Sequence, residues 1–294
     1  MKFDVYVSPI CGLCYGSTTA VNKTKEVLKT NKNVVLYKEI LHNKNVLNEL
    51  EKSGAKQKET LSELEKNDYV IIRGHGEPLS TFKYLEENNI SYLDCTCPNV
   101  KNINLLVKEK SELGYKIILI GKYGFNNKAM HPEVFATIGW CKDRPILIED
   151  ESEINSIDLS YEKYYLVVQT TFSRDKSEKY INLIEHLMKK NNKHFEYRNT
   201  ICNAQKNINK AAENLAKDMD VMIVIGGKHS SNSKELYNNI STIKETYFIE
   251  NPEEVLDLIK IFIEKKHQKI GITAGASTMK EDVLKIKELL ETAN

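Results

Sequence analysis

The chain has 294 residues, of which 41% are apolar and 28% are charged, and its 42 basic and 41 acidic side chains leave a net charge of +1. A chain of this size and composition can bury a sizeable core, either in one large domain or in two to three lobes. The near-neutral charge excludes a strong overall attraction to nucleic acid or to membranes. An anionic partner must therefore be recognised by a local site.

The sequence shows no sign of a membrane or secreted protein. Its longest apolar runs, KIILIG and DVMIVIGG, are far shorter than the roughly 20 residues of a membrane-spanning helix. The N-terminal stretch MKFDVYVSPICG lacks the longer apolar region of a secretion signal. We therefore expect a cytoplasmic protein, in which six cysteines serve metal or redox chemistry more often than structural disulfides.

Short β-branched runs alternate with amphipathic segments along the whole chain. The predicted strands are residues 3–7, 34–40, 69–73, 90–94, 116–120, 145–149, 164–169, 219–225, 245–249 and 269–273, with a weaker one near 195–199. Segments 177–189 and 205–219 place their apolar side chains on one helical face. Alternating strands and helices predict parallel α/β sheets, whose ligand sites lie at the carboxyl ends of the strands.

Three cysteines occupy equivalent positions after predicted strands. Cys14 follows the first strand and precedes a helix, Cys97 follows the strand at 90–94, and Cys202 follows the weak strand near 195–199. This suggests three α/β units that each contribute one thiolate to a common centre. A zinc site more often has paired ligands and a fourth ligand, whereas three isolated thiolates suit a 4Fe-4S cluster with one open iron. Buried structural cysteines are the alternative reading.

Polar side chains suited to a diphosphate group follow other predicted strands. They are His42, His75, His131, Ser230, Ser231, Asn232 and Ser277. Hydroxyl, amide and imidazole groups, together with free backbone N–H groups at a helix start, can bind phosphate oxygens. Each feature alone is weak, since a Ser-Ser-Asn turn often only caps a helix. Their coincidence with the three cysteines predicts one composite site.

Nine short motifs carry a family resemblance. GLCYG, LHNKNV, RGHG, DCTCPNV, HPEV, QTT, TICNA, SSNS and TAGAS occur in this order, from Cys14 to Ser277. In this order they resemble the motifs of the LytB family, the 4-hydroxy-3-methylbut-2-enyl diphosphate reductases. The resemblance implies an α/β fold of three similar lobes in a trefoil arrangement around a central 4Fe-4S cluster. It also implies the last step of the non-mevalonate isoprenoid pathway, in which two electrons and two protons remove the C4 hydroxyl group to give isopentenyl and dimethylallyl diphosphates.

The same resemblance implies roles for single residues. Cys14, Cys97 and Cys202 would ligate the cluster, and the strand-end histidines, serines and Asn232 would bind the diphosphate. Glu133 of HPEV would supply the proton, Thr170 of QTT would hold the substrate hydroxyl, and His131 would act beside both. The lobes would span residues 1–97, 98–198 and 199–294, with the N-terminal strand a candidate to dock on the third lobe. The implied electron donor is a ferredoxin or flavodoxin, with no nucleic-acid or membrane partner.

The chain also departs from the family pattern. The stretch GKYGFNNKAM ahead of HPEV is longer than expected, and Ser17 and Glu77 replace valines that are usual in the family. Cys11 and Cys95 are extra thiols near the predicted ligands, while Cys141 resembles an ordinary small apolar residue.

Three alternative functions remain open at this stage. A divergent relative could reduce another allylic or diphosphate substrate. A thioredoxin-like enzyme would use Cys11 and Cys14 together, but it would leave Cys97, Cys202 and the histidines unexplained. A non-enzymatic iron–sulfur sensor or electron carrier would need no diphosphate-binding residues.

Overall fold

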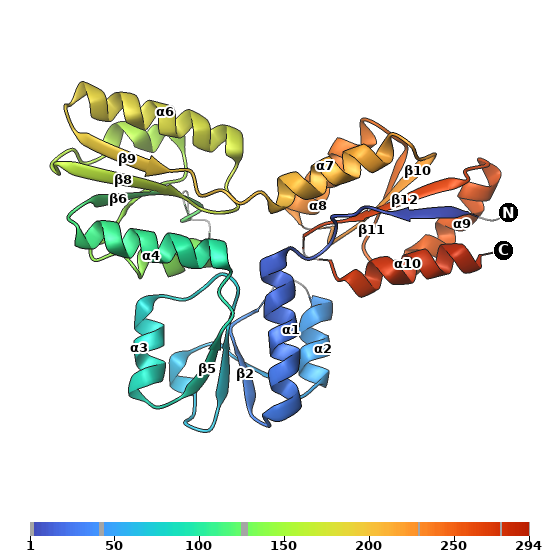
Figure 1. Ribbon diagram of the computed structural model, residues 1–294, viewed down its shortest axis with the longest axis horizontal. Coiled ribbons are helices and arrows are strands. Elements are labelled where there is room, and N and C mark those ends of the chain that lie inside the picture. The colour runs from blue at the N-terminus through green and yellow to red at the C-terminus, as the bar shows by residue number, and fades with distance from the viewer. Residues whose placement is uncertain (1–2, 41–43, 125–128, 229, 277, 294) are drawn as a thin grey trace. The chain divides into compact units, whose positions relative to one another are not determined.

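The described part of the chain forms three α/β lobes, each built on a sheet of parallel strands. The structure is a computed structural model that describes residues 3–40, 44–124, 129–228, 230–276 and 278–293. Within these ranges, twelve strands form three four-stranded sheets in which every strand pairing is parallel. Helices connect the strands of each sheet (Figure 1). The predicted α/β class with three similar lobes is confirmed.

The first lobe is built on the sheet with the strand order β3-β2-β4-β5. Strands β2 and β4 are almost entirely buried, because they carry apolar side chains on both faces of the sheet. The elements from α1 to β5 are α1 (Tyr15–Thr30), β2 (Val34–Tyr37), α2 (Lys44–Lys52), β3 (Lys56–Lys58), the 3-10 helix η1 (Leu61–Glu63), β4 (Tyr69–Ile72), α3 (Leu79–Glu87) and β5 (Ser91–Asp94).

The second lobe has the strand order β7-β6-β8-β9. Alternate residues of β6 serve two cores: Ile118 and Ile120 pack on the side of α6, and Ile117 packs on the side of α4. The elements are α4 (Pro98–Glu112), β6 (Lys116–Ile120), α5 (Pro132–Ile138), β7 (Ile146–Ile148), η3 (Glu151–Ser156), β8 (Lys163–Val168), α6 (Arg174–Lys190) and β9 (His194–Arg198).

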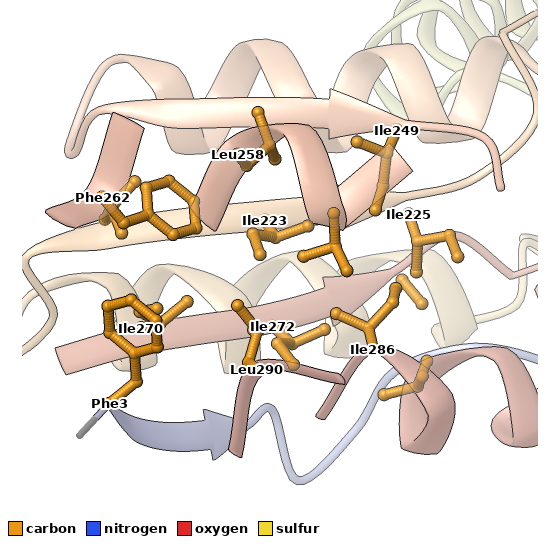
Figure 2. Packing of buried hydrophobic residues seen from close by; sticks show 14 residues of the cluster. Phe3, Ile223, Ile225, Ile249, Leu258, Phe262, Ile270, Ile272, Ile286 and Leu290 are labelled. Atoms are coloured by element: carbon orange, nitrogen blue, oxygen red, sulfur yellow. The ribbon is translucent and has the colours of Figure 1, made fainter. Parts of the chain in front are cut away.

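The third lobe has the strand order β1-β12-β10-β11, so the N-terminal strand pairs with the last strand of the chain. Figure 2 shows Leu258 and Phe262 of α9, together with Ile286 and Leu290 of α10, among the isoleucines of β10 and β12. Helices α7 and α8 cover the other face. The elements are β1 (Asp4–Val7), α7 (Ala204–Ala216), β10 (Val221–Ile225), α8 (Ser231–Ser241), β11 (Thr246–Ile249), η4 (Pro252–Glu254), α9 (Val255–Glu264), β12 (Lys269–Ala274) and α10 (Lys280–Thr292).

The chain divides into two compact units. One comprises Met1–Thr18, Leu41–Glu49 and Asn203–Asn294, and it holds the third sheet. The other comprises Thr19–Ile40 and Leu50–Cys202, and it holds the first and second sheets. The predicted lobe boundaries at residues 97 and 198 and the trefoil arrangement stay predictions. In the part of the chain that the structure describes, no helix has both the length and the apolar character needed to cross a membrane.

Candidate active site

Each of the three predicted cluster cysteines lies between the end of a strand and the start of a helix. Cys14 directly precedes α1, Cys97 is the N-cap residue of α4 after β5, and Cys202 lies between β9 and α7. All six cysteines of the chain are free thiols. The strand-end placement expected from the sequence is therefore observed, whereas the ligand role of these cysteines stays a prediction.

The backbones of Cys97 and Cys202, which share one compact unit, are each tied to a neighbouring strand-end turn. The Cys97 amide donates a hydrogen bond to the Gly74 carbonyl oxygen (2.9 Å), in the turn after β4 that carries His75. The Cys202 amide donates to the Thr170 carbonyl oxygen (2.9 Å), in the turn after β8. Each of these cysteines is thus fixed beside a turn that carries a predicted substrate-binding residue.

In the other unit, the end of strand β12 holds the turn that carries Cys14. The Gly12 amide donates to the Ala274 carbonyl oxygen (3.1 Å). Gly12 has φ +75°, and a Cβ atom there would lie 2.9 Å from the Thr278 carbonyl oxygen, so any other residue would strain the turn. The Cys14 Sγ atom lies 3.4 Å from the Ser17 hydroxyl, where either atom can donate. Ser17 therefore provides a polar neighbour for this thiol.

Glu133 and Thr170 form a buried hydrogen-bonded pair in the second lobe. Glu133, which is 2% exposed, lies in the first turn of α5, and Thr170 follows β8. The amide and the hydroxyl of Thr170 donate to the two carboxylate oxygens of Glu133, each over 2.6 Å. Burial raises the pKa of Glu133 to about 7, although the hydrogen bonds from Thr170 lower it. An acid with a pKa near neutrality can both hold and release a proton at physiological pH.

Two of the predicted diphosphate-binding histidines lie side by side. The rings of His75 and His131 meet edge to face, with 5.3 Å between their centroids. His131 is also the N-cap residue of α5, and its Nδ1 atom accepts a hydrogen bond from the Glu133 amide (3.2 Å). The pair of imidazoles therefore adjoins the buried acid.

No sequence pattern assigned a role to Gln169, although it belongs to the QTT motif. Its side chain is buried, and its Oε1 atom accepts a hydrogen bond from the Lys122 amide (2.9 Å). The Lys122 carbonyl oxygen in turn accepts from the His131 amide (2.8 Å). Gln169 is therefore connected to the His131 backbone through Lys122. The sequence signal that could have identified Gln169 is a polar residue at the end of an apolar strand, because residues at neighbouring strand ends lie close together at the edge of a parallel sheet.

The SSNS turn begins helix α8 in the third lobe. Ser230 is the N-cap residue, and its hydroxyl oxygen accepts a hydrogen bond from the Ser233 amide (3.3 Å). Asn232 is exposed, whereas Ser233 is buried. A Cβ atom at Gly226 or Gly275 would lie 2.4 or 2.1 Å from the Ser233 hydroxyl, so both glycines allow α8 to approach the strand ends closely. The turn therefore caps helix α8. Its role in binding the diphosphate group stays a prediction.

Three predicted diphosphate ligands fall outside the described part of the chain: His42, Ser277 and the side chain of Ser231. Among the residues that the structure does describe, no three His, Cys, Asp or Glu side chains gather closely enough to hold a single metal ion. A 4Fe-4S cluster binds each thiolate through a different iron atom, so its cysteines do not need to meet at one point.

The two extra thiols near the predicted ligands are partly or fully buried. Cys11 packs against the core of the third lobe, and burial raises the pKa of its thiol. Cys95 is buried beside Thr24 of α1, and burial raises the pKa of Cys95 to about 11. Raised thiol pKa values disfavour the reactive thiolate. The Cys11 environment therefore argues against a dithiol centre formed with Cys14.

Comparison with known proteins extends the similarity to nearly the whole chain. A family model described as LytB protein matches residues 5–291. A 4-hydroxy-3-methylbut-2-enyl diphosphate reductase from Caldanaerobacter subterraneus subsp. tengcongensis is 37% identical over 295 residues, covering 97% of each chain. The protein of the same name from Clostridioides difficile is 34% identical over 277 residues, covering 94% of each chain.

The solved structures that resemble this chain are of reductases with closely similar names. The structure described as (E)-4-hydroxy-3-methyl-but-2-enyl diphosphate reductase, the terminal enzyme of the non-mevalonate pathway, matches with a TM-score of 0.82 and 31% identity. The match covers 97% of this chain and 98% of that one. The E-1-hydroxy-2-methyl-but-2-enyl-4-diphosphate reductase from Plasmodium falciparum matches with a TM-score of 0.76 and 27% identity, covering 100% of this chain and 89% of the other. By sequence and by fold, the chain belongs to the LytB family.

Proposed function

We propose that this chain is a 4-hydroxy-3-methylbut-2-enyl diphosphate reductase, an iron–sulfur oxidoreductase of the last step of the non-mevalonate isoprenoid pathway. In this reaction two electrons and two protons remove the C4 hydroxyl group as water and give isopentenyl and dimethylallyl diphosphates. Family membership and the names of the relatives support the assignment. The observation that supports the assignment most directly is the buried pair of Glu133 and Thr170, because the reaction needs a protonated acid beside the leaving hydroxyl group.

The proposed cofactor is a 4Fe-4S cluster held by Cys14, Cys97 and Cys202. Each of these thiols lies between the end of a strand and the start of a helix, and cysteine thiolates are the usual ligands of such clusters. Three protein ligands leave one of the four irons without a cysteine. When bound, the cluster would supply the two electrons and a Lewis-acidic iron with an open position.

Glu133 is proposed to supply the proton, and Thr170 to hold the substrate hydroxyl group beside it. With a pKa of about 7, a large fraction of Glu133 is protonated at neutral pH. The O–H group of the protonated acid can donate to the Thr170 hydroxyl oxygen. The hydrogen of Thr170 is then available for the substrate oxygen, since a hydroxyl group can accept and donate at once. The pair thus forms a short proton path that excludes bulk water.

The diphosphate group is proposed to bind to polar residues at the strand ends. They are His42, His75, His131, Ser230, Ser231, Asn232 and Ser277. The adjacent rings of His75 and His131 support this assignment, because two imidazoles can donate to neighbouring phosphate oxygens. The Ser230 hydroxyl accepts from a backbone amide, which leaves its hydrogen available for phosphate. A diphosphate beside His131 would also raise the pKa of Glu133 further, because nearby negative charge disfavours the carboxylate.

The proposal includes a partner, a location and lobe boundaries. Electrons would come from a small ferredoxin or flavodoxin. The protein would act in the cytoplasm, where six free cysteines stay reduced. The proposed lobes span residues 1–97, 98–198 and 199–294.

Anaerobic turnover with the diphosphate substrate and a reduced dye tests the proposed function. We expect isopentenyl and dimethylallyl diphosphates as products. Thr170→Val removes the hydroxyl group at constant size and should lower kcat by about 100-fold, whereas Thr170→Ser keeps the hydroxyl group and should retain most activity. A protein with a full cluster that forms neither product would overturn the assigned reaction and favour a divergent relative or an electron carrier.

A further inference from the structure

The turn between β4 and α3 carries His75 between two residues of opposite charge. Arg73 precedes the histidine by two positions and Glu77 follows it by two, and the Arg73 Nε atom lies 2.8 Å from the Glu77 Oε1 atom. Gly76 between them has φ +75°, and a Cβ atom there would lie 3.1 Å from the Thr96 Cγ2 atom. The ion pair therefore closes a tight turn around His75.

Glu77 has a second cationic partner in the same unit. The Lys38 Nζ atom lies 3.0 Å from the other carboxylate oxygen of Glu77. Lys38 directly follows β2 and has φ +62°, a left-handed conformation that residues other than glycine seldom adopt. Its ammonium group also lies over the rings of Tyr37 (4.7 Å to the centroid) and Phe135 (5.2 Å). The end of β2 is thereby attached to the turn around His75.

Glu77 is also connected to helix α5, whose N-cap residue is His131. The Trp140 Nε1 atom, just after the helix, donates a hydrogen bond to the Glu77 carbonyl oxygen (3.0 Å). Phe135 within the helix contacts Lys38, the partner of the Glu77 carboxylate. Glu77 therefore links the turn of His75 to the helix of His131 through both its backbone and its side chain.

Stability alone does not account for this arrangement. Glu77 is 0% exposed, and burying a carboxylate with two cations costs desolvation energy that an apolar side chain of similar volume would avoid. Buried ion pairs can instead select one geometry among several packed alternatives. The turn and the helix that Glu77 links carry His75 and His131, whose rings meet edge to face.

We propose that Glu77 is a positioning residue that holds His75 against His131, so that the two imidazoles form a preformed site for the diphosphate group. This inference rests on the proposed function, because it takes the diphosphate as the ligand of both histidines. Glu77 follows His75 by two residues and exerts its effect through the turn.

Glu77→Gln tests the inference, with Asp68→Asn as the matched control. Asp68 pairs with Lys58 in the same lobe, at 2.7 Å and also mostly buried, but it precedes β4 whereas Glu77 follows it. Both changes remove one buried carboxylate charge at constant size. Binding of inorganic diphosphate to the anaerobic, cluster-loaded protein is measured by calorimetry, alongside KM and kcat for the substrate.

We expect Glu77→Gln to weaken diphosphate binding and raise KM by about tenfold, the effect of losing one charge-assisted hydrogen bond, with little change in kcat. Glu77→Asp should restore part of the affinity, and Asp68→Asn should leave it unchanged. Unchanged or tighter binding in Glu77→Gln would overturn the inference, because removing a negative charge without a positioning effect strengthens anion binding. Equal weakening in Asp68→Asn would overturn it as well, since general destabilisation would then suffice.

Two further measurements keep the result decisive. If Glu77→Gln does not fold, Trp140→Phe removes the hydrogen bond to the Glu77 carbonyl oxygen without changing the charge and should weaken diphosphate binding in the same direction; unchanged binding would refute the inference. Wild-type protein that binds inorganic diphosphate without turning over the substrate would contradict the proposed function, and the comparison of variants would still decide the role of Glu77. Wild-type protein that binds no diphosphate would contradict both.

Discussion

Replacing Glu133 by glutamine removes one buried ionisable group and keeps its size. Burial raises the pKa of this carboxyl from 4.5 to about 7. One pKa unit corresponds to about 1.4 kcal/mol, so ionisation of Glu133 costs the folded state about 3 kcal/mol relative to the unfolded state. Glutamine carries no such cost at any pH.

The sign of the effect follows from proton binding. Because the folded pKa is higher than the unfolded one, the folded protein binds more protons between about pH 4.5 and 7. The stability contributed by the neutral carboxyl is fully present below pH 4.5 and is lost as the pH rises through 7. The free energy of unfolding of the wild type should therefore fall, relative to that of Glu133→Gln, by about 3 kcal/mol between about pH 4 and 8.

Urea unfolding of the two proteins across this pH range provides the assay, since other titrating groups cancel in the difference. A difference that stays constant with pH would refute the raised pKa. Turnover gives an independent readout: Glu133→Gln should lose about 100-fold or more in kcat while keeping its iron and its affinity for diphosphate, because an amide supplies no proton. Near-normal turnover would place the proton source elsewhere.

Serine at any one of the three proposed cluster cysteines should remove iron and activity together, which iron and sulfide analysis measures; a full cluster in one such variant would exclude that cysteine as a ligand. Cys95→Ala should keep the iron content and lose about 1 kcal/mol of stability in urea unfolding, because the buried thiol sits beside Thr24; loss of iron would contradict this packing role. Gly76→Ala should destabilise the protein by about 1 to 3 kcal/mol, since alanine would be strained at φ +75° and would press on Thr96; unchanged stability would mean that the turn adapts.

The two central strands of each sheet could be predicted because their apolar runs are buried on both faces; these strands are β2, β4, β6, β8, β10 and β12. The eleven strand segments expected from the sequence all appear within the described residues, including the weak one that became β9. Strand β3 was missed because Lys56–Lys58 is polar and joins the sheet edge through backbone pairing with β2. Backbone pairing at an edge leaves no hydrophobic pattern in the sequence.

The candidate site was predictable to the extent that its residues follow strands. The placement of Cys14, Cys97 and Cys202 follows from that rule. The contact of Glu133 with Thr170 joins residues from different strand ends, and its expectation came from family resemblance. The contacts of Glu77 could not be predicted from the sequence. A charged residue in a turn normally faces solvent, and its partner Lys38 lies 39 residues away along the chain.

Three cysteines are proposed to hold a cluster with one open iron that meets the substrate. Mössbauer spectroscopy of anaerobic protein labelled with iron-57, before and after addition of the diphosphate substrate, tests this proposal most directly. We expect one iron distinct from the other three, with a signal that changes when the substrate is added. Four equivalent, thiolate-bound irons that do not respond to the substrate would contradict the proposal.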